Sequence, residues 1–228
     1  MFYRSFFTAT LAACAVLSGG TTLADLLIAD NSEPPSYSLI NSLGQSLNEG
    51  KAILGAFNSD SWSYEKSQWK FEGKSYNQDE LTYSQLVDMQ NSFTSTLAPE
   101  SISEEQDGTV TNGTFTLNGI YKTPPSSLTT PVYLMVTGKT GELAVFVFRS
   151  VTNDSVLTYE NLNLSNLSPL DLCLLPKTEA SAGGYYMDCI LGNVDRDLST
   201  IQLLVPEPAT ATLGLLGLAA LMTRRRRR

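Results

Sequence analysis

The sequence predicts a mainly β protein: an antiparallel β-sandwich of jelly-roll-like order with one amphipathic helix, between an N-terminal signal peptide and a C-terminal membrane helix. Two observations on residues 25–204 predict the sandwich. Short segments rich in β-branched and aromatic residues recur there, separated by turn-forming residues. Only one stretch has its apolar residues at helical spacing. A body of roughly 180 residues suffices for one hydrophobic core, so we expect a single domain.

Residues 1–24 have the features of a secretory signal peptide. One basic residue, Arg4, precedes an apolar stretch from Phe6 to Leu17, and small residues lead up to Ala24. We therefore expect cleavage between Ala24 and Asp25, followed by export of the mature chain.

Cys14 offers a second way to mature the N-terminus. The residues Leu11-Ala12-Ala13 before it resemble a bacterial lipobox, in which the cysteine would be acylated and become the first mature residue. The apolar stretch continues past Cys14, which favours the later cleavage site. The lipoprotein reading stays open as an alternative.

Seven segments of the body are predicted strands. The most regular hairpin joins two nearly continuous apolar runs through Gly138-Lys139-Thr140-Gly141, as expected at the centre of a sheet buried on both faces. Asn112-Gly113 is the residue pair that tight hairpin turns favour. The predicted strands are residues 51–57, 61–64, 68–72, 113–121, 132–137, 142–151 and 201–205.

One amphipathic helix is predicted within residues 79–97. Leu86, Met89, Phe93 and Leu97 recur at three- and four-residue steps. The segment from Thr82 to Gln85 has the sequence of a capping box, which marks a helix N-terminus. We expect this helix to cover a sheet edge or one end of the sandwich.

Two cysteines, Cys173 and Cys189, remain after removal of the signal peptide. In an exported protein such a pair predicts a disulfide, here closing a loop of roughly fifteen residues and contributing about 3 kcal/mol. The segments 172–175 and 185–191 flank a turn-forming stretch, so the bridge would close a hairpin. The alternative is a pair of buried thiols.

Charge and composition exclude several functions. Residues 25–204 hold nine basic against 22 acidic residues, a balance that repels phosphate backbones, so we expect no nucleic-acid partner. The chain has no histidine, which excludes Ser-His-Asp triads and HExxH zinc sites. We expect no catalytic residues, no cofactor and no enzymatic activity. A pair of carboxylates acting as a glycan hydrolase stays open as an alternative.

Alternating aromatic residues form the first candidate binding surface of the body. Trp62 and Tyr64 would project from one face of a strand, as would Trp69 and Phe71. Aromatic platforms of this kind stack on sugar rings, but core packing explains the alternation more simply. We expect these residues to lie in the core.

Asn193, Asp195 and Asp197 form a second candidate, with oxygen ligands at every second position. A calcium loop would use such residues. Arg196 lies between them, however, and the glycine and final glutamate of an EF-hand are missing. A solvated turn is the favoured interpretation, and we predict no metal site.

The C-terminal residues 205–228 form a third unit. An uncharged apolar run extends from Ala209 to Met222, which as a helix is about 21 Å long against a hydrocarbon core of roughly 30 Å. It spans a membrane only if flanking residues and bilayer thinning help. A cluster of arginines favours the cytoplasmic side, placing the body outside. The residues singled out here are Val205, Pro206, Glu207, Pro208, Arg224, Arg225, Arg226, Arg227 and Arg228.

This combination of Pro-Glu-Pro, apolar run and arginine cluster resembles the PEP-CTERM sorting signal of bacteria. The resemblance covers about a tenth of the chain. It implies membrane anchoring through the tail and processing near Pro206-Glu207-Pro208 by exosortase, a transpeptidase-like membrane enzyme. Release to the cell surface or medium would follow.

The resemblance also suggests a role for the body. Proteins with this signal are associated with exopolysaccharide and extracellular-matrix production, which predicts a structural or glycan-associated surface protein with polysaccharide as a further partner. The alternatives are a secreted carboxylate-based glycan hydrolase and a protein that stays anchored as a single-pass or lipidated periplasmic protein.

Overall fold

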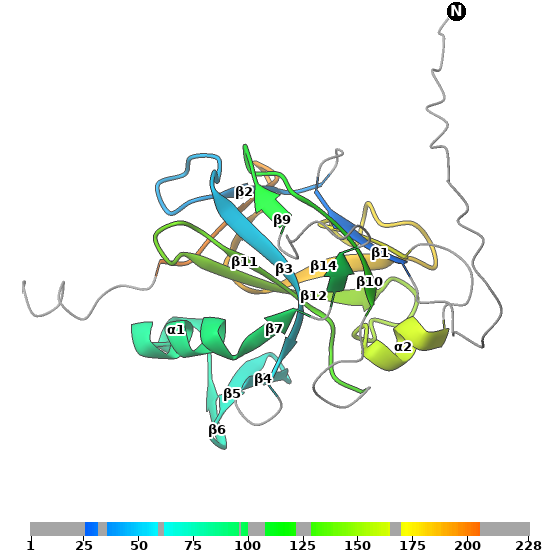
Figure 1. Ribbon diagram of the computed structural model, residues 1–228, viewed down its shortest axis with the longest axis horizontal. Coiled ribbons are helices and arrows are strands. Elements are labelled where there is room, and N and C mark those ends of the chain that lie inside the picture. Colours follow the sequence, from blue (N-terminus) through cyan, green and yellow to red (C-terminus); the bar gives the residue numbers. More distant parts are fainter. Residues whose placement is uncertain are drawn as a thin grey trace, which may run out of the picture.

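The computed structural model describes residues 26–31, 36–58, 62–95, 97–99, 108–121, 129–164 and 170–205 (Figure 1). β-Strands dominate them, and most neighbouring strands are antiparallel. The predicted mainly β fold with antiparallel sheets is confirmed. The predicted signal peptide, its cleavage site at Ala24 and Asp25, and the tail from Pro206 to Arg228 lie outside the described residues.

The central sheet is built around the predicted hairpin of two apolar runs. Leu134 of one run lies opposite Phe146 of the other and opposite Leu54 of the next strand, and all three are fully or almost fully buried. The strand order is β14 (Tyr185–Leu191), β12 (Leu143–Ser150), β11 (Tyr133–Thr137), β3 (Gly50–Phe57) and β7 (Phe93–Ser95), and β9 (Gly108–Val110) also pairs with β3.

A second sheet packs on one face of the central sheet, in the order β13 (Leu170–Cys173), β1 (Leu26–Asp30), β10 (Thr116–Tyr121) and β8 (Leu97–Pro99). Ala29, Leu117 and Leu172 of this sheet share a core cluster with Leu134 and Phe146. The short helix α2 (Tyr159–Leu164), which the sequence analysis did not predict, adds to the same cluster. This sheet covers one face of β11 and β12, and the layer described next covers the other. Burial on both sides therefore explains why these two strands are apolar on both faces.

The opposite face of the central sheet is covered by a small meander and the predicted helix. Trp62 and Trp69 of the meander and Leu86 and Met89 of the helix are buried against Tyr133 and its neighbours. The elements are β4 (Trp62–Glu65), β5 (Gln68–Phe71), β6 (Lys74–Tyr76), the 3-10 turn η1 (Gln78–Glu80) and α1 (Tyr83–Ser92). A third layer thus completes the core.

The helix α1 begins as predicted but ends early. The backbone N–H of Thr82 donates to Oε1 of Gln85 over 2.9 Å, as expected for the capping box. Phe93 and Leu97 were predicted to be helical, but Phe93 has extended dihedrals and starts β7, while Leu97 starts β8. The reason is tertiary: β7 pairs with the end of β3, so sheet formation overrides the helical spacing.

The Asn-Gly turn forms where it was predicted. Asn112 and Gly113 both have positive φ angles, 53° and 76°, as a tight hairpin turn requires. The turn joins β9 to β10, which belong to different sheets, so the chain changes layers at this point.

The predicted disulfide is absent: Cys173 and Cys189 are not joined. β13 leaves the expected hairpin and pairs in parallel with β1, while β14 pairs with β12 of the central sheet. The two cysteines therefore lie in different sheets. Cys173 Sγ donates to Asp30 Oδ1 over 3.6 Å, and Cys189 Sγ donates to the Leu191 carbonyl over 3.4 Å.

A further three-stranded sheet contains the last two strands of the described chain. Its order is β15 (Asn193–Asp195), β16 (Thr200–Gln202) and β2 (Ser38–Ile40), with β16 parallel to β2. The described part of the chain holds no helix long and apolar enough to cross a membrane.

Candidate functional site at the exit of the folded body

The chain leaves the folded body through a fixed segment after β16. Leu203 is 1% exposed. Leu204 and Leu143 at the start of β12 exchange two backbone hydrogen bonds, each of 2.9 Å. Val205, the next residue, is 41% exposed. Among the described residues, Leu204 is therefore the last that pairs with another strand.

A buried carboxylate holds this exit in place. Glu142 is only 6% exposed, and its Oε1 accepts hydrogen bonds from the Ser42 backbone N–H at 3.1 Å and from the Ser42 hydroxyl at 3.0 Å. Gln202 of β16 in turn donates from Nε2 to the Ser42 carbonyl at 2.8 Å. A buried carboxylate is stable only with such donors. Gly138 leaves it room, because a Cβ there would lie 2.3 Å from Glu142 Oε2.

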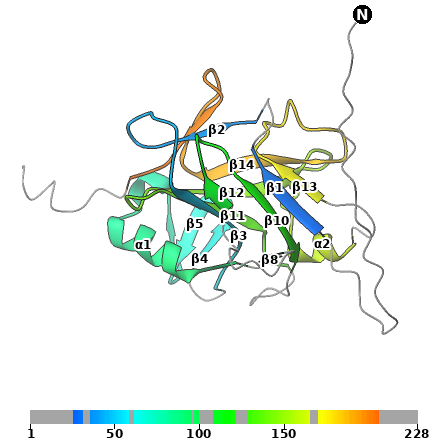
Figure 2. The same ribbon diagram turned by 45° about the horizontal axis from the view of Figure 1, so that its top comes forward.

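Two further contacts join the β11–β12 turn to α1 and to the β2–β3 loop near this exit. Gln90 of α1 donates from Nε2 to the Gly141 carbonyl at 3.3 Å, and Lys139 forms an ion pair with Glu49. Figures 1 and 2 show α1, the blue β2–β3 loop and the orange end of the body at one end of the molecule. We call this the exit end; it comprises residues 41–49, 83–92, 138–142 and 202–205.

Sequence comparison identifies a motif in the segment that begins at this exit. A family model described as the PEP-CTERM protein-sorting motif matches residues 204–228. The chain carries a PEP-CTERM sorting motif. The motif indicates an exported protein that is anchored through its C-terminal region and processed by an exosortase. Comparison with curated proteins and with solved structures found no match.

The PEP-CTERM motif begins close to the end of the described part of the chain. Its first matched residue, Leu204, is the last described residue that pairs with the sheet, and Val205 lies outside this pairing. The other predicted sorting residues, Pro206 to Pro208 and Arg224 to Arg228, lie beyond the described part. The sequence did not predict the hydrogen bonds that join Glu142, Ser42 and Gln202, because these residues are far apart in the sequence and belong to no motif.

A groove on another part of the body is the second candidate site. It encloses about 500 Å³ between the loop after β13 and the β15–β16 hairpin, with β14 as its floor. Figure 2 shows that loop in yellow and the hairpin in orange, standing on the same side of the molecule. Its lining includes Tyr37, Lys177, Glu179, Tyr186, Asp188 and Arg196.

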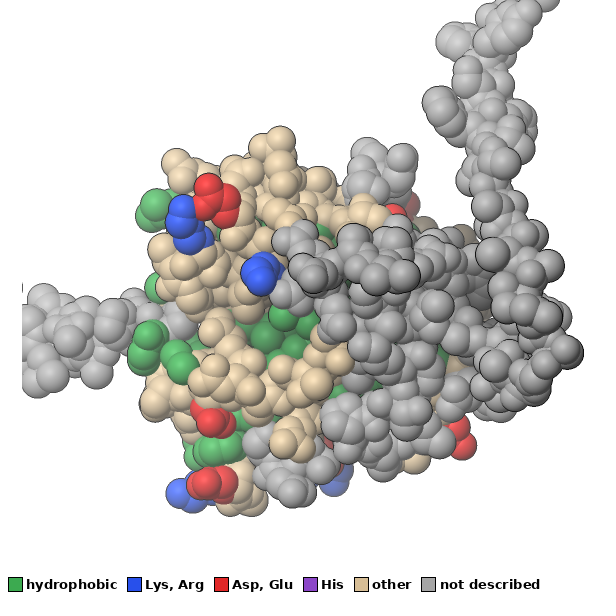
Figure 3. All heavy atoms as spheres, viewed as in Figure 1, with side chains coloured by type: hydrophobic (Ala, Val, Ile, Leu, Met, Phe, Trp, Pro, Cys, Tyr) green, Lys and Arg blue, Asp and Glu red, His purple; other side chains and the backbone are tan. Residues whose placement is uncertain are grey.

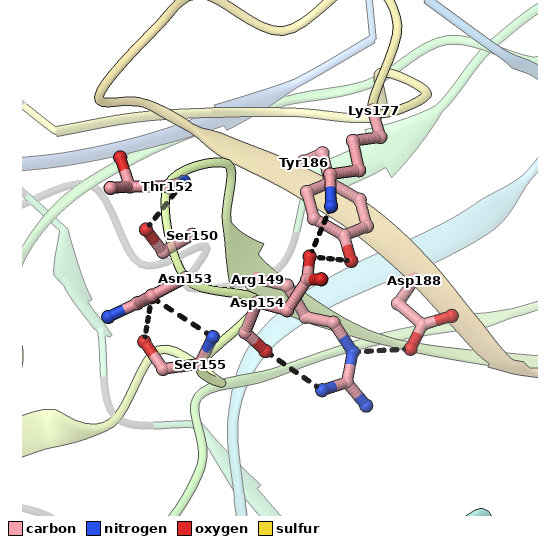
Figure 4. Close-up of polar contacts among 9 residues, drawn as sticks. All are labelled: Arg149, Ser150, Thr152, Asn153, Asp154, Ser155, Lys177, Tyr186 and Asp188. Carbon is pink, nitrogen blue, oxygen red and sulfur yellow. Dashed lines mark hydrogen bonds and ion pairs between the residues drawn. The ribbon is translucent and has the colours of Figure 1, made fainter.

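Ion pairs organise one wall of this groove (Figure 4). Asp154 Oδ1 accepts from Lys177 Nζ at 2.6 Å and from the Tyr186 hydroxyl at 2.9 Å. Arg149 Nε donates to Asp188 Oδ2 at 2.6 Å. The hydrogen bonds from Lys177 and Tyr186 lower the pKa of Asp154, while burial and the bond to Asp154 raise the pKa of Tyr186. Cationic, anionic and aromatic groups therefore meet at one wall.

The two body sites singled out from the sequence have structural roles. Trp62 and Trp69 are 3% and 1% exposed, so neither ring forms a sugar platform and core packing is the correct interpretation. Their indole N–H groups donate to Asp88 Oδ2 and to the Ile190 carbonyl. Asp195 Oδ1 accepts from the backbone N–H groups of Asp197 and Leu198, as in a solvated turn.

Proposed function

We propose that this protein is exported, held by an apolar membrane helix within residues 209–222, cut near Pro206-Glu207-Pro208, and then delivered to the cell surface or medium. One observation carries the proposal: the PEP-CTERM motif starts at Leu204, the last described residue that pairs with the sheet. Pro206 and Pro208 lack a backbone N–H and cannot extend this pairing. We therefore expect the peptide to be cut to stay outside the strand pairing, where an enzyme can hold it in an extended form.

The body itself is proposed to be a non-enzymatic, sandwich-like domain with a structural or glycan-associated role. The groove supports glycan association, because it combines a partly exposed aromatic ring, Tyr186, one face of which the Lys177 amine contacts, with charged hydrogen-bonding groups of both signs. Sugars are bound by such combinations of an apolar ring face and a few oriented polar groups.

Glycan association is tested on immobilised polysaccharide from the host envelope. Tyr186→Ala removes the ring from the groove and should abolish retention of the purified protein. Tyr83→Ala removes a half-exposed ring from α1, at the exit end, and should leave retention unchanged. Equal retention of both variants would place glycan binding elsewhere.

A carboxylate-based glycan hydrolase is the second candidate function. It is favoured by Glu179 and Asp188, which line the same groove from its loop and its floor. Two such acids can serve as general acid and as base or nucleophile. Release of reducing ends from the bound polysaccharide, lost in Asp188→Asn and in Glu179→Gln, would establish this activity and remove the non-enzymatic proposal.

Sorting is tested by intact mass and cell fractionation in the native host. We expect a mature chain that begins near Asp25, ends close to Glu207 and is found at the surface or in the medium. Replacing Pro206, Glu207 and Pro208 by alanine should spare insertion and block processing. Deleting Arg224 to Arg228 should weaken membrane retention. If both variants are processed like the wild type, the sorting proposal is wrong.

Two results would favour permanent anchoring instead. A chain that keeps Arg228 and stays in the inner membrane would make the tail a plain anchor. Lipid labelling that is lost in Cys14→Ser would identify a lipoprotein.

A further inference from the structure

The distance between body and membrane is limited by the short segment that joins them. Five residue steps separate Leu204, which is fixed to β12, from Ala209, where the apolar run begins. A fully extended chain covers at most about 18 Å in five steps. A domain of this size has a radius of gyration of about 16 Å. With the tail inserted, the body cannot lie far from the bilayer, and the exit end is the described part of the body nearest to the lipid.

The exit end presents apolar side chains to solvent. Leu43 is 80% exposed and follows Ser42, which is tied to both Glu142 and Gln202. Val205 is 41% exposed. In the space-filling view, hydrophobic side chains are exposed along the left edge of the molecule, on the side where α1 lies (Figure 3). A single exposed leucine is ordinary, but this one lies beside the point of attachment.

The acidic groups of the exit end are engaged with partners. Glu49 forms an ion pair with Lys139, and Glu142 is buried on Ser42. Asp88 of α1 accepts the indole N–H of Trp62 at 2.9 Å. The body as a whole is strongly acidic and is repelled by anionic headgroups. The exit end can approach anionic headgroups, because Lys139 balances the charge of Glu49 and Glu142 is buried away from solvent.

We propose that the exit end of the body docks on the outer surface of the lipid bilayer while the tail is inserted, with Leu43 and Val205 in the headgroup region. This docking rests on the proposed membrane anchoring. It holds the body in one orientation and keeps the segment from Val205 to Pro208 at the membrane surface, where a membrane-embedded processing enzyme can reach it. The side chains of Leu43 and Val205 then lose their contact with water, which favours the docked orientation.

Leu198 provides a matched control for Leu43. It is also a leucine in a turn and is 72% exposed. It lies in the turn before β16, however, and the whole of that strand separates it from Leu204 along the chain. If exposure alone caused lipid contact, both leucines would make it. If the short tether orients the body, only Leu43 would.

The experiment uses the chain from Asp25 to Arg228, with the C-terminal tail intact, in vesicles of phosphatidylcholine and phosphatidylglycerol. Leu43→Cys and Leu198→Cys are each labelled with an environment-sensitive fluorophore, and wild type treated in the same way gives the background from Cys173 and Cys189. A lipid with a nitroxide on its headgroup then quenches fluorophores at the surface. We expect loss of fluorescence at position 43 and none above background at position 198.

Two outcomes would overturn the docking, and they differ in what else they remove. A chain that floats with the vesicles but shows equal quenching at both positions, or more at position 198, contradicts the docked orientation and leaves anchoring intact. A chain that does not float with the vesicles contradicts the anchoring itself, and the docking with it.

Discussion

Leu204 and Leu143 exchange two backbone hydrogen bonds of 2.9 Å, so the first residue of the sorting motif is clamped to the first residue of the central strand β12. Leu143 is fully buried and Leu203 nearly so. A pull on the tail is therefore transmitted directly to the core sheet. The clamp also sets the register at which the described chain reaches Val205.

Leu204→Pro should loosen this clamp. Proline removes the N–H that donates to the Leu143 carbonyl, and the net loss should be about 1 kcal/mol of the free energy of unfolding. Amide hydrogen exchange should become faster in residues 200–203. Val205→Pro is the control, because Val205 lies beyond the paired residues. Equal exchange in the two variants would show that the clamp does not hold the exit.

Glu142→Ala should destabilise the exit more than Glu142→Gln. Alanine leaves the N–H and hydroxyl of the partly buried Ser42 without their acceptor, at a cost of about 1–3 kcal/mol in the free energy of unfolding. Glutamine keeps a carbonyl oxygen that can accept from both groups. Urea unfolding of the two variants checks the difference. A glutamine variant as unstable as the alanine variant would mean that the negative charge, and not the acceptor, matters.

Gly113→Ala should be far more damaging than Gly73→Ala. Both glycines have φ near +75°, so each substitution carries the left-handed backbone penalty of about 1–2 kcal/mol. A Cβ on Gly73 meets nothing within 4 Å, whereas one on Gly113 would lie 2.4 Å from Ser38 Oγ and 2.6 Å from the Leu39 carbonyl oxygen. Thermal unfolding should show a small decrease for Gly73→Ala and a large one for Gly113→Ala. Equal decreases would refute the predicted crowding.

Local patterns in the sequence predicted the elements that local physics decides. The hairpin through Gly138 and Gly141, the Asn112-Gly113 turn and the capping box at Thr82 each depend on a few neighbouring residues, and each forms as expected.

The wrong or missing predictions concern contacts between distant segments. The spacing of Phe93 fits a helix, yet its strand pairing with Phe57 prevails. The spacing of Cys173 and Cys189 fits a disulfide, yet Cys173 pairs in register with Asp30 of β1, in another sheet. Parallel pairing of β16 with β2, on which the exit depends, joins segments about 160 residues apart and leaves no local signal.

Trp69→Ala should test the meander as part of the core and not as a binding surface. Trp69 is 1% exposed, contacts Phe57 edge to face at 5.7 Å between ring centroids, and bonds to the Ile190 carbonyl. Its truncation should lower the free energy of unfolding by about 3–5 kcal/mol. Truncation of the half-exposed Tyr83 should change it by about 0.5 kcal/mol or less. If Trp69→Ala keeps wild-type stability in urea, the third layer does not contribute to the core.

Alkaline pH should destabilise the body through a buried thiol and a buried phenol. Burial raises the pKa of Cys189 from 9.0 to about 12 and that of Tyr133 from 10.0 to about 12. Between the unfolded and folded pKa values, the unfolded chain loses these protons and the folded chain keeps them, so the free energy of unfolding falls as pH rises above 9. Each such proton contributes a slope of about 1.4 kcal/mol per pH unit.

Cys189→Ala isolates the contribution of the thiol. The variant removes the group that titrates first, so its stability should fall less steeply with pH than that of the wild type in the range from about 9 to about 10. Its stability near neutral pH should be lower than that of the wild type. The Cys189 sulfur lies close to Gly192, and the smaller alanine side chain leaves a gap there. Urea unfolding over this pH range separates the two effects. Parallel curves for the variant and the wild type would mean that the Cys189 thiol ionises as readily in the folded body as in the unfolded chain.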